Sequence, residues 1–136
     1  RVRLKPLVPK ERIIELRSVI THEVFLHESL AKYIRRLVGA TRPFNAESEW
    51  HQRSPSGLVE KCVDLGASPR ATITWGRLVK VWALLMHRRA EVYPEDVQQL
   101  ARYILGHRVW LGPHAASHGV SVEMVIDDIV ESVPVP

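Results

Sequence analysis

Apolar side chains recur at steps of three and four residues through most of the chain, which is the spacing of one buried helical face. These stripes predict helices over residues 9–20, 27–39, 69–89, 94–105 and 121–132. No stretch alternates apolar and polar residues over a useful strand length. We therefore predict an all-α fold, a compact bundle of about five or six helices with antiparallel neighbours.

Several of the predicted helices begin with residues suited to a helix start. Proline is tolerated at the first helical position, and serine is a good N-cap because its hydroxyl accepts a hydrogen bond from a free backbone N–H. The residues in these roles are Pro9, Ser68, Pro69, Pro94 and Ser121.

The segments between the stripes complete a single domain over residues 1–136. Residues 44–57 are polar, rich in Ser, Pro and Gly and without a sustained period, which predicts a long, mobile surface loop. Residues 58–65 form a short helix or turn, residues 109–119 a loop, and residues 133–136 an extended tail.

Composition fits a folded intracellular domain. Hydrophobic residues make up 46% of the 136 residues, enough for a core. Cys62 is the only cysteine and excludes an intrachain disulfide, so a reducing, cytoplasmic setting is expected, with Cys62 buried on a helical face. The sequence has no apolar run of membrane-spanning length.

The net charge of +4 is unevenly distributed, with a basic first part over residues 1–42 and an acidic last part over residues 94–136. One hypothesis is a stand-alone nucleic-acid-binding module, and another is an adaptor that docks a protein partner. Solvated helix faces explain the basic clusters without nucleic acid, so we do not expect a nucleic-acid partner. The cations of the first hypothesis are Arg17, Lys32, Arg35 and Arg36.

One histidine pair and the paired carboxylates are candidates for metal binding or acid-base catalysis, but the support for each is weak. His114 and His118 have a spacing that binds zinc on a helix, but they lie in a Gly-Pro-rich loop without a nearby thiol or carboxylate. The paired carboxylates 95–96 suit the positive end of a helix, and Asp128 should face solvent. We predict neither a metal site nor a general acid-base pair.

Arg70 is the residue that local physics does not explain. It falls in the first turn of the helix predicted to begin at Pro69, where partial positive charge disfavours a cation. The preceding Gly66-Ala67-Ser68 is small enough for a ligand to approach the backbone. A phosphate beside the free N–H groups and a local ion pair with Asp64 are about equally good explanations.

Several motifs in order resemble the C-terminal lid domain of MoxR-type AAA+ ATPases. They are "YIRRLVGATR", "LGASPRA" followed by a long helix, "HRRAEVYPEDVQQLARYILGHRV" and the closing "VSVEMVIDDIVESVPVP". The resemblance covers roughly residues 10–136, and the order of the motifs makes it more specific than any one of them.

The resemblance implies a helical lid over a nucleotide, with Arg70 as the sensor-2 arginine that reaches the terminal phosphates of ATP. Ser68 and Pro69 would set the helix start that aims it. It also implies an ATPase core in the same protein, a homo-oligomeric ring, a chaperone-like role and von Willebrand factor A-type partners. The core, which would hold Mg²⁺, is missing, so no catalytic residue and no bound cofactor are expected in this chain alone.

The sequence departs from the family pattern at three places. Tyr93 stands where the family has Thr or a similar helix cap, Trp75 and Trp82 are bulkier than usual, and the 44–57 loop is long. The chain begins at Arg1 rather than Met, and we therefore expect a fragment of a longer ATPase.

Overall fold

The computed structural model describes residues 5–43 and 56–136. Almost all of the loop predicted over residues 44–57 therefore lies outside the described residues. The elements in chain order are α1 (Lys10–Glu23), α2 (Glu28–Ala40), α3 (Leu58–Cys62), β1 (Val63–Leu65), α4 (Arg70–His87), α5 (Pro94–Leu105), β2 (Trp110–Leu111), α6 (Pro113–Ser117) and α7 (Val122–Ser132).

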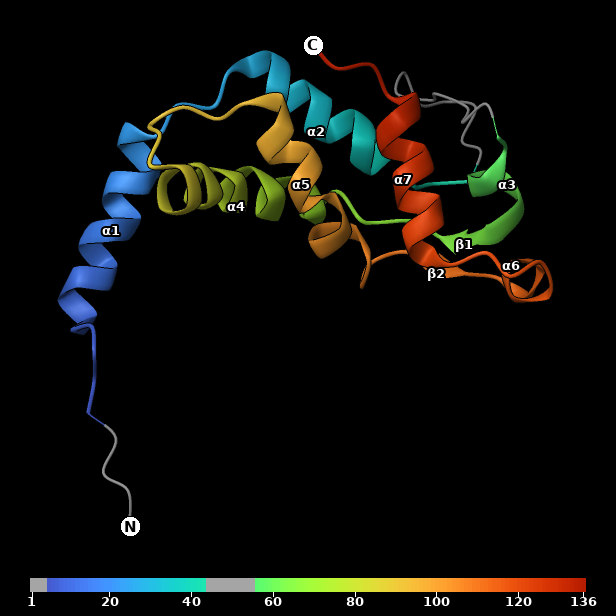
Figure 1. The fold of residues 1–136 in the computed structure, drawn as a ribbon, viewed down its shortest axis with the longest axis horizontal. Helices are drawn as coiled ribbons and strands as arrows, with labels where there is room; N and C mark the ends of the chain where they lie inside the picture. The colour runs from blue at the N-terminus through green and yellow to red at the C-terminus, as the bar shows by residue number, and fades with distance from the viewer. Residues whose placement is uncertain (1–4, 44–55) are drawn as a thin grey trace.

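The predicted helical bundle is confirmed. Seven helices are present in the described part of the chain, and five of them, α1, α2, α4, α5 and α7, are substantial. Figure 1 shows α1 leaving the bundle at one end, while α3, α6 and the two strands lie at the opposite end. None of the helices in the described ranges is long and apolar enough to cross a membrane.

The core is built where the apolar stripes of α2, α4, α5 and α7 meet. Its largest fully buried side chains include Trp75, Tyr33 and Leu100, each at most 2% exposed. Burial raises the pKa of the Tyr33 phenol, whose oxygen accepts a hydrogen bond from Gln98 (3.3 Å). Trp82 joins α4 to α5 by donating its indole N–H to Gln99 (3.0 Å). Both unusual tryptophans thus stabilise contacts of the long helix.

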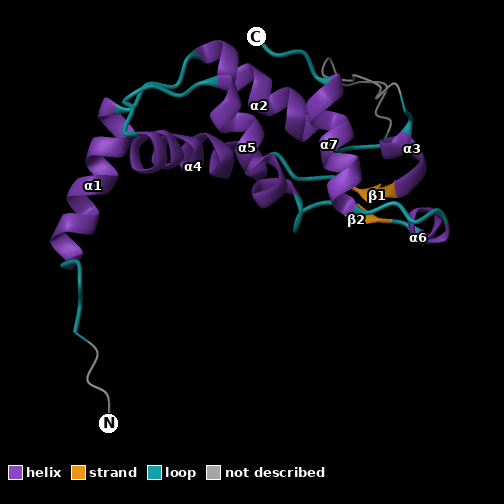
Figure 2. Ribbon diagram, viewed as in Figure 1, coloured by secondary structure: helices purple, strands orange, loops and turns teal. Residues whose placement is uncertain are grey.

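The structure adds one small β feature to the predicted all-α bundle. β1 and β2 form a small antiparallel pair in which Val63 lies opposite Leu111 and Leu65 opposite Trp110 (Figure 2). The strands have three and two residues, too few for alternation to be visible in the sequence. The segment predicted as a loop over residues 109–119 also contains the short helix α6. Cys62, just before β1, is buried as predicted.

The apolar stripe of α1 does not face the core, contrary to its prediction. No residue of this 14-residue helix is buried, and Ile13, Leu16 and Val19 are each more than a third exposed. The helix contacts α4 near its C-terminal end, where Lys80 donates a hydrogen bond to the carbonyl oxygen of Thr21 (3.1 Å). Periodicity revealed an apolar face but could not say whether this chain supplies the surface that covers it.

Candidate functional site at the start of helix α4

The segment before α4 is fastened to the end of α2 through one residue, Ala67. The buried Thr41 hydroxyl donates to the carbonyl oxygen of Val38 (2.7 Å) and accepts the N–H of Ala67 (2.9 Å). The Nε of Arg42 donates to the carbonyl oxygen of Ala67 (3.1 Å). Both backbone polar groups of Ala67 are therefore satisfied by two consecutive residues at the end of α2.

Gly66 allows this close approach. A Cβ atom on residue 66 would lie 2.5 Å from the carbonyl oxygen of Thr41 and 2.8 Å from the Cγ of Arg42. Such distances are far inside van der Waals contact, so a side chain at position 66 would push the segment away from α2. The glycine is needed here for space, and its removal gives a direct test of the contact.

Gly66→Ala is expected to lower the free energy of unfolding of the chain by about 1–3 kcal/mol, the usual cost of overpacking. Gly76→Ala is the matched control, because a Cβ there meets only Leu26 at 3.7 Å and a helix interior favours Ala over Gly by roughly 0.5–1 kcal/mol. Urea unfolding followed by circular dichroism measures both. Equal stability of the Gly66→Ala variant and the parent would contradict the tight fit.

The helix that follows begins at Arg70, one residue after the predicted start. Pro69 precedes it with nearly helical dihedral angles (φ −55°, ψ −24°), and no side chain caps the start. Ser68 contributes its backbone carbonyl, which accepts the N–H of Ala71 (2.9 Å). The first turn carries no acidic residue, so the partial positive charge of the helix start is not offset locally.

The Arg70 side chain is exposed and, within the described residues, has no hydrogen bond or ion pair. The partner considered from the sequence, Asp64, lies instead against Gly112, where an added Cβ would be 2.3 Å from its Oδ1 atom. An exposed arginine at the positively polarised start of a helix, without an acid to neutralise it, makes this end of α4 a place that favours an anion.

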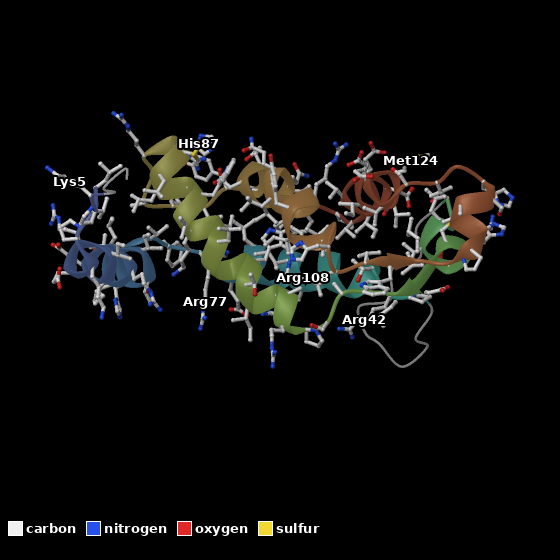
Figure 3. All side chains as sticks on the ribbon, turned by 90° about the horizontal axis from the view of Figure 1, so that it is seen from below. Lys5, Arg42, Arg77, His87, Arg108 and Met124 are labelled. Carbon is white, nitrogen blue, oxygen red and sulfur yellow. The ribbon has the colours of Figure 1, made fainter. Side chains whose placement is uncertain are left out.

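The exposed face of α4 continues from Arg70 along a groove formed with α1. Arg77 lies two turns further along and projects outward from α4 (Figure 3). The groove has a volume of about 510 Å³, a size suited to a small organic ligand. Cationic and apolar side chains together line it: Arg17, Ile20, Thr21, Thr72, Ile73, Gly76, Arg77, Lys80 and Val81.

The other sequence candidates do not join this site. His114 and His118 lie on and just after α6, with their rings stacked 4.0 Å apart. In the described part of the chain, no three His, Cys, Asp or Glu side chains are grouped to hold a metal ion. Lys32, one of the proposed nucleic-acid contacts, pairs with Glu28 one turn away on α2 (3.1 Å).

Sequence reasoning missed Thr41 and Arg42, and it explained Gly66 by the approach of a ligand, whereas the space at Gly66 is filled by these two residues of the chain itself. "ATR" and "LGAS" were noticed only as separate motifs, and their contact joins positions 25 or 26 apart in sequence. For Asp96 the sequence predicts helix capping and a dipole contact, but not burial. Asp96 is only 1% exposed, and its carboxylate accepts the backbone N–H of Tyr93 (2.8 Å). The helix start that seemed poorly capped by Tyr93 is thus stabilised by Asp96.

In a comparison with known protein families, residues 56–129 match the family described as the AAA lid domain. YeaC of Bacillus subtilis, which is uncharacterized, is 34% identical over 98% of this chain. The chaperone MoxR1 of Mycobacterium tuberculosis is 29% identical over 97%. The chain spans about a third of each of these relatives, 36% and 33% respectively.

A solved structure gives the same fold. The crystal structure of a proposed ATPase from Cytophaga hutchinsonii matches with a TM-score of 0.80 and 35% identity. The match covers 93% of this chain and 36% of that one. The helical arrangement that positions the start of α4 is therefore shared with this ATPase structure.

Proposed function

Because the chain belongs to the AAA lid domains and is homologous to MoxR chaperones, we propose that it helps a MoxR-type ATPase bind and sense ATP through Arg70. The observation that carries this proposal is the exposed Arg70 at the start of α4, without an acidic partner among the described residues. The site of this chain is half of a nucleotide site, and the other half belongs to the ATPase core.

The chemistry of Arg70 suits the terminal phosphates of ATP. A guanidinium is always charged and presents its N–H groups in a planar fork that matches phosphate oxygens. As the bond to the γ-phosphate breaks, negative charge is redistributed over the phosphate oxygens, and a fixed cation stabilises it. Mg²⁺, which residues of the core would hold, would supply further positive charge to the phosphates. The role of this chain's own residues is to place one cation, Arg70, at the positively polarised start of α4.

The groove between α1 and α4 supports a ligand larger than phosphate. It continues the Arg70 face of α4 and combines the cations Arg17 and Arg77 with apolar side chains such as Ile20 and Ile73. A base and sugar present apolar faces and polar edges, so they suit this mixed lining. We propose that the nucleotide lies along α4, with its phosphates toward Arg70.

The exposed face of α1 supports contact with the ATPase core. An isolated helix of 14 residues is marginal in water, and the apolar Ile13, Ile14 and Leu16 lie open. Burying them would stabilise both the helix and the domain interface. We therefore propose that α1 packs on the core and keeps the lid beside the nucleotide.

Ile14→Ser tests this packing. Ile14 is 56% exposed, so the variant should change the free energy of unfolding of this chain by less than about 0.5 kcal/mol. In the ATPase with its core, the same change should speed proteolysis between the two domains. Ile34→Ser is the control: Ile34 is 1% exposed, so the substitution should destabilise the chain with or without the core. Unchanged proteolysis of the Ile14→Ser ATPase would contradict the α1 contact.

We also propose that nucleotide-dependent movement of the lid affects assembly into a homo-oligomeric ring and action on a von Willebrand factor A-type partner. The support is the homology to MoxR1, which is described as a chaperone. Measuring the oligomeric state with and without ATP tests the first part. If the molecular mass of the assembly were the same with and without ATP, the proposed link between nucleotide and ring assembly would be wrong.

A further inference from the structure

We propose that Arg42 is a positioning residue that holds Arg70 in place for ATP turnover. This inference rests on the proposed function of Arg70. Arg42 lies at the end of α2, near the start of α4 (Figure 3), and it reaches the segment before Arg70 rather than the nucleotide side of the helix. Its effect on turnover is therefore expected to pass through Arg70.

The backbone of Arg42 is held in place by a hydrogen bond to α2. Its backbone N–H donates to the carbonyl oxygen of Gly39 (3.1 Å), and the N–H of Thr41 donates to that of Val38 (3.3 Å). Both residues thus continue the last turn of α2, whose core face is buried. The half-buried Arg42 side chain then directs its Nε to Ala67. The direction of this hydrogen bond is set by α2.

The connection from Ala67 to Arg70 is short and ordered. Ala67 is fully buried, and both of its backbone polar groups are bonded by Thr41 and Arg42. The next carbonyls, those of Ser68 and Pro69, already accept N–H groups of the first turn of α4, from Ala71 (2.9 Å) and Thr72 (3.0 Å). A shift of Ala67 would therefore move the start of α4, and Arg70 with it.

Loss of the Arg42 hydrogen bond removes one of the two anchors of Ala67. The carbonyl oxygen of Ala67 would then lose its hydrogen-bond donor. Of the two side-chain hydrogen bonds that join Ala67 to α2, only the one from its N–H to Thr41 would remain. Because catalysis depends steeply on the position of charged groups, a displacement of about 1 Å can cost up to a hundredfold in rate. A partial release of the segment should cost less than removal of Arg70 itself.

The test is a double-mutant cycle on kcat in the ATPase that contains this domain, with Arg42→Ala, Arg70→Ala and the double variant. We expect Arg42→Ala to lower kcat about tenfold, with a smaller change in KM for ATP. In the Arg70→Ala background, Arg42→Ala should lower kcat less than about twofold, because its effect passes through Arg70. Arg35→Ala, on the exposed face of α2, is the control and should leave kcat unchanged.

Arg42→Lys provides a rescue that a general loss of folding would not show. A lysine ammonium can still donate to the Ala67 carbonyl, so kcat should recover to within about threefold of the parent. If Arg42→Ala does not fold, Arg42→Lys and Arg42→Gln, both able to donate, must each retain most of the parent kcat for the proposal to stand.

Two results would overturn the inference while leaving the role of Arg70 intact: full kcat in the Arg42→Ala variant, or effects of Arg42→Ala and Arg70→Ala that multiply. The first would mean that the hydrogen bond does not position Arg70, and the second that Arg42 acts independently of it. Failure of the proposed function looks different. In that case Arg70→Ala alone leaves kcat and KM at the values of the parent.

Discussion

Arg70→Ala is expected to lower ATP turnover about a hundredfold in the ATPase that carries this domain, the effect of removing one preorganised donor from a transition-state oxygen. Arg70 is exposed at the first turn of α4 and has no acidic partner in the described ranges. Alanine removes the charge without disturbing a core contact, so the folded domain should persist. Steady-state phosphate release at saturating ATP measures the change.

Two further variants separate a phosphate contact from a general effect of charge. Arg70→Lys keeps the cation but loses the planar fork, so its turnover should lie between those of the parent and the alanine variant. Lys32→Ala removes a cation that pairs with Glu28 on α2 and should leave turnover unchanged. Parent-like turnover in Arg70→Ala would exclude Arg70 as the phosphate-sensing residue and would favour the adaptor hypothesis.

The helices predicted from apolar stripes are all present in the structure, whether or not this chain covers the stripe. In α2, the apolar residues Leu30, Ile34 and Leu37 repeat at helical spacing, and all three are buried. In α1, Ile13 and Leu16 repeat in the same way and remain exposed. The apolar and polar residues are much more clearly separated onto two faces in α2 than in α1, and the described residues cover only the stripe of α2. A sequence stripe therefore predicts a helix more reliably than it predicts burial.

In the candidate site, too, residues whose role follows from the local sequence can be predicted, and residues whose role depends on helix packing cannot. Arg70 was found from the sequence because the helix dipole makes a cation in the first turn unusual. The contacts of Thr41 and Arg42 with Ala67 could not be found, because they depend on how α2 and α4 pack. The β1–β2 pair was missed for the same reason: its strands are defined by pairing more than by their own residues.

Asp96 shows how strongly the tertiary environment can change the meaning of a residue. Its position in the first turn of α5 predicts helix capping and a favourable interaction with the helix dipole. In the structure its carboxylate is buried, with Oδ1 2.8 Å from a terminal nitrogen of Arg89 and Oδ2 2.8 Å from the backbone nitrogen of Tyr93. The Arg89 guanidinium also lies 4.0 Å from the centre of the Tyr93 ring. One carboxylate thus organises the turn between α4 and α5.

Asp96→Ala is expected to lower the free energy of unfolding by about 3 kcal/mol, because removing one partner of a buried ion pair leaves the other charge without compensation. The backbone N–H of Tyr93 would also lose its acceptor. The loss falls at the low end of the range for buried pairs, since the Arg89 side chain is 27% exposed and water can reach it. Urea unfolding of the 136-residue chain at neutral pH measures the change.

Two further variants, Asp96→Asn and Glu95→Ala, separate the contributions of the Asp96 charge, its hydrogen bond to Tyr93 and the helix dipole to this loss of stability. Asparagine can still accept the N–H of Tyr93 but carries no charge, so it should cost about half as much as alanine. Glu95 is an exposed acid in the same helical turn, and its removal should cost less than about 1 kcal/mol, the value of a helix-dipole contact. If Asp96→Ala were no more destabilising than Glu95→Ala, the buried pair would contribute nothing beyond the dipole. The turn between α4 and α5 would then be stabilised by the apolar contacts of the two helices.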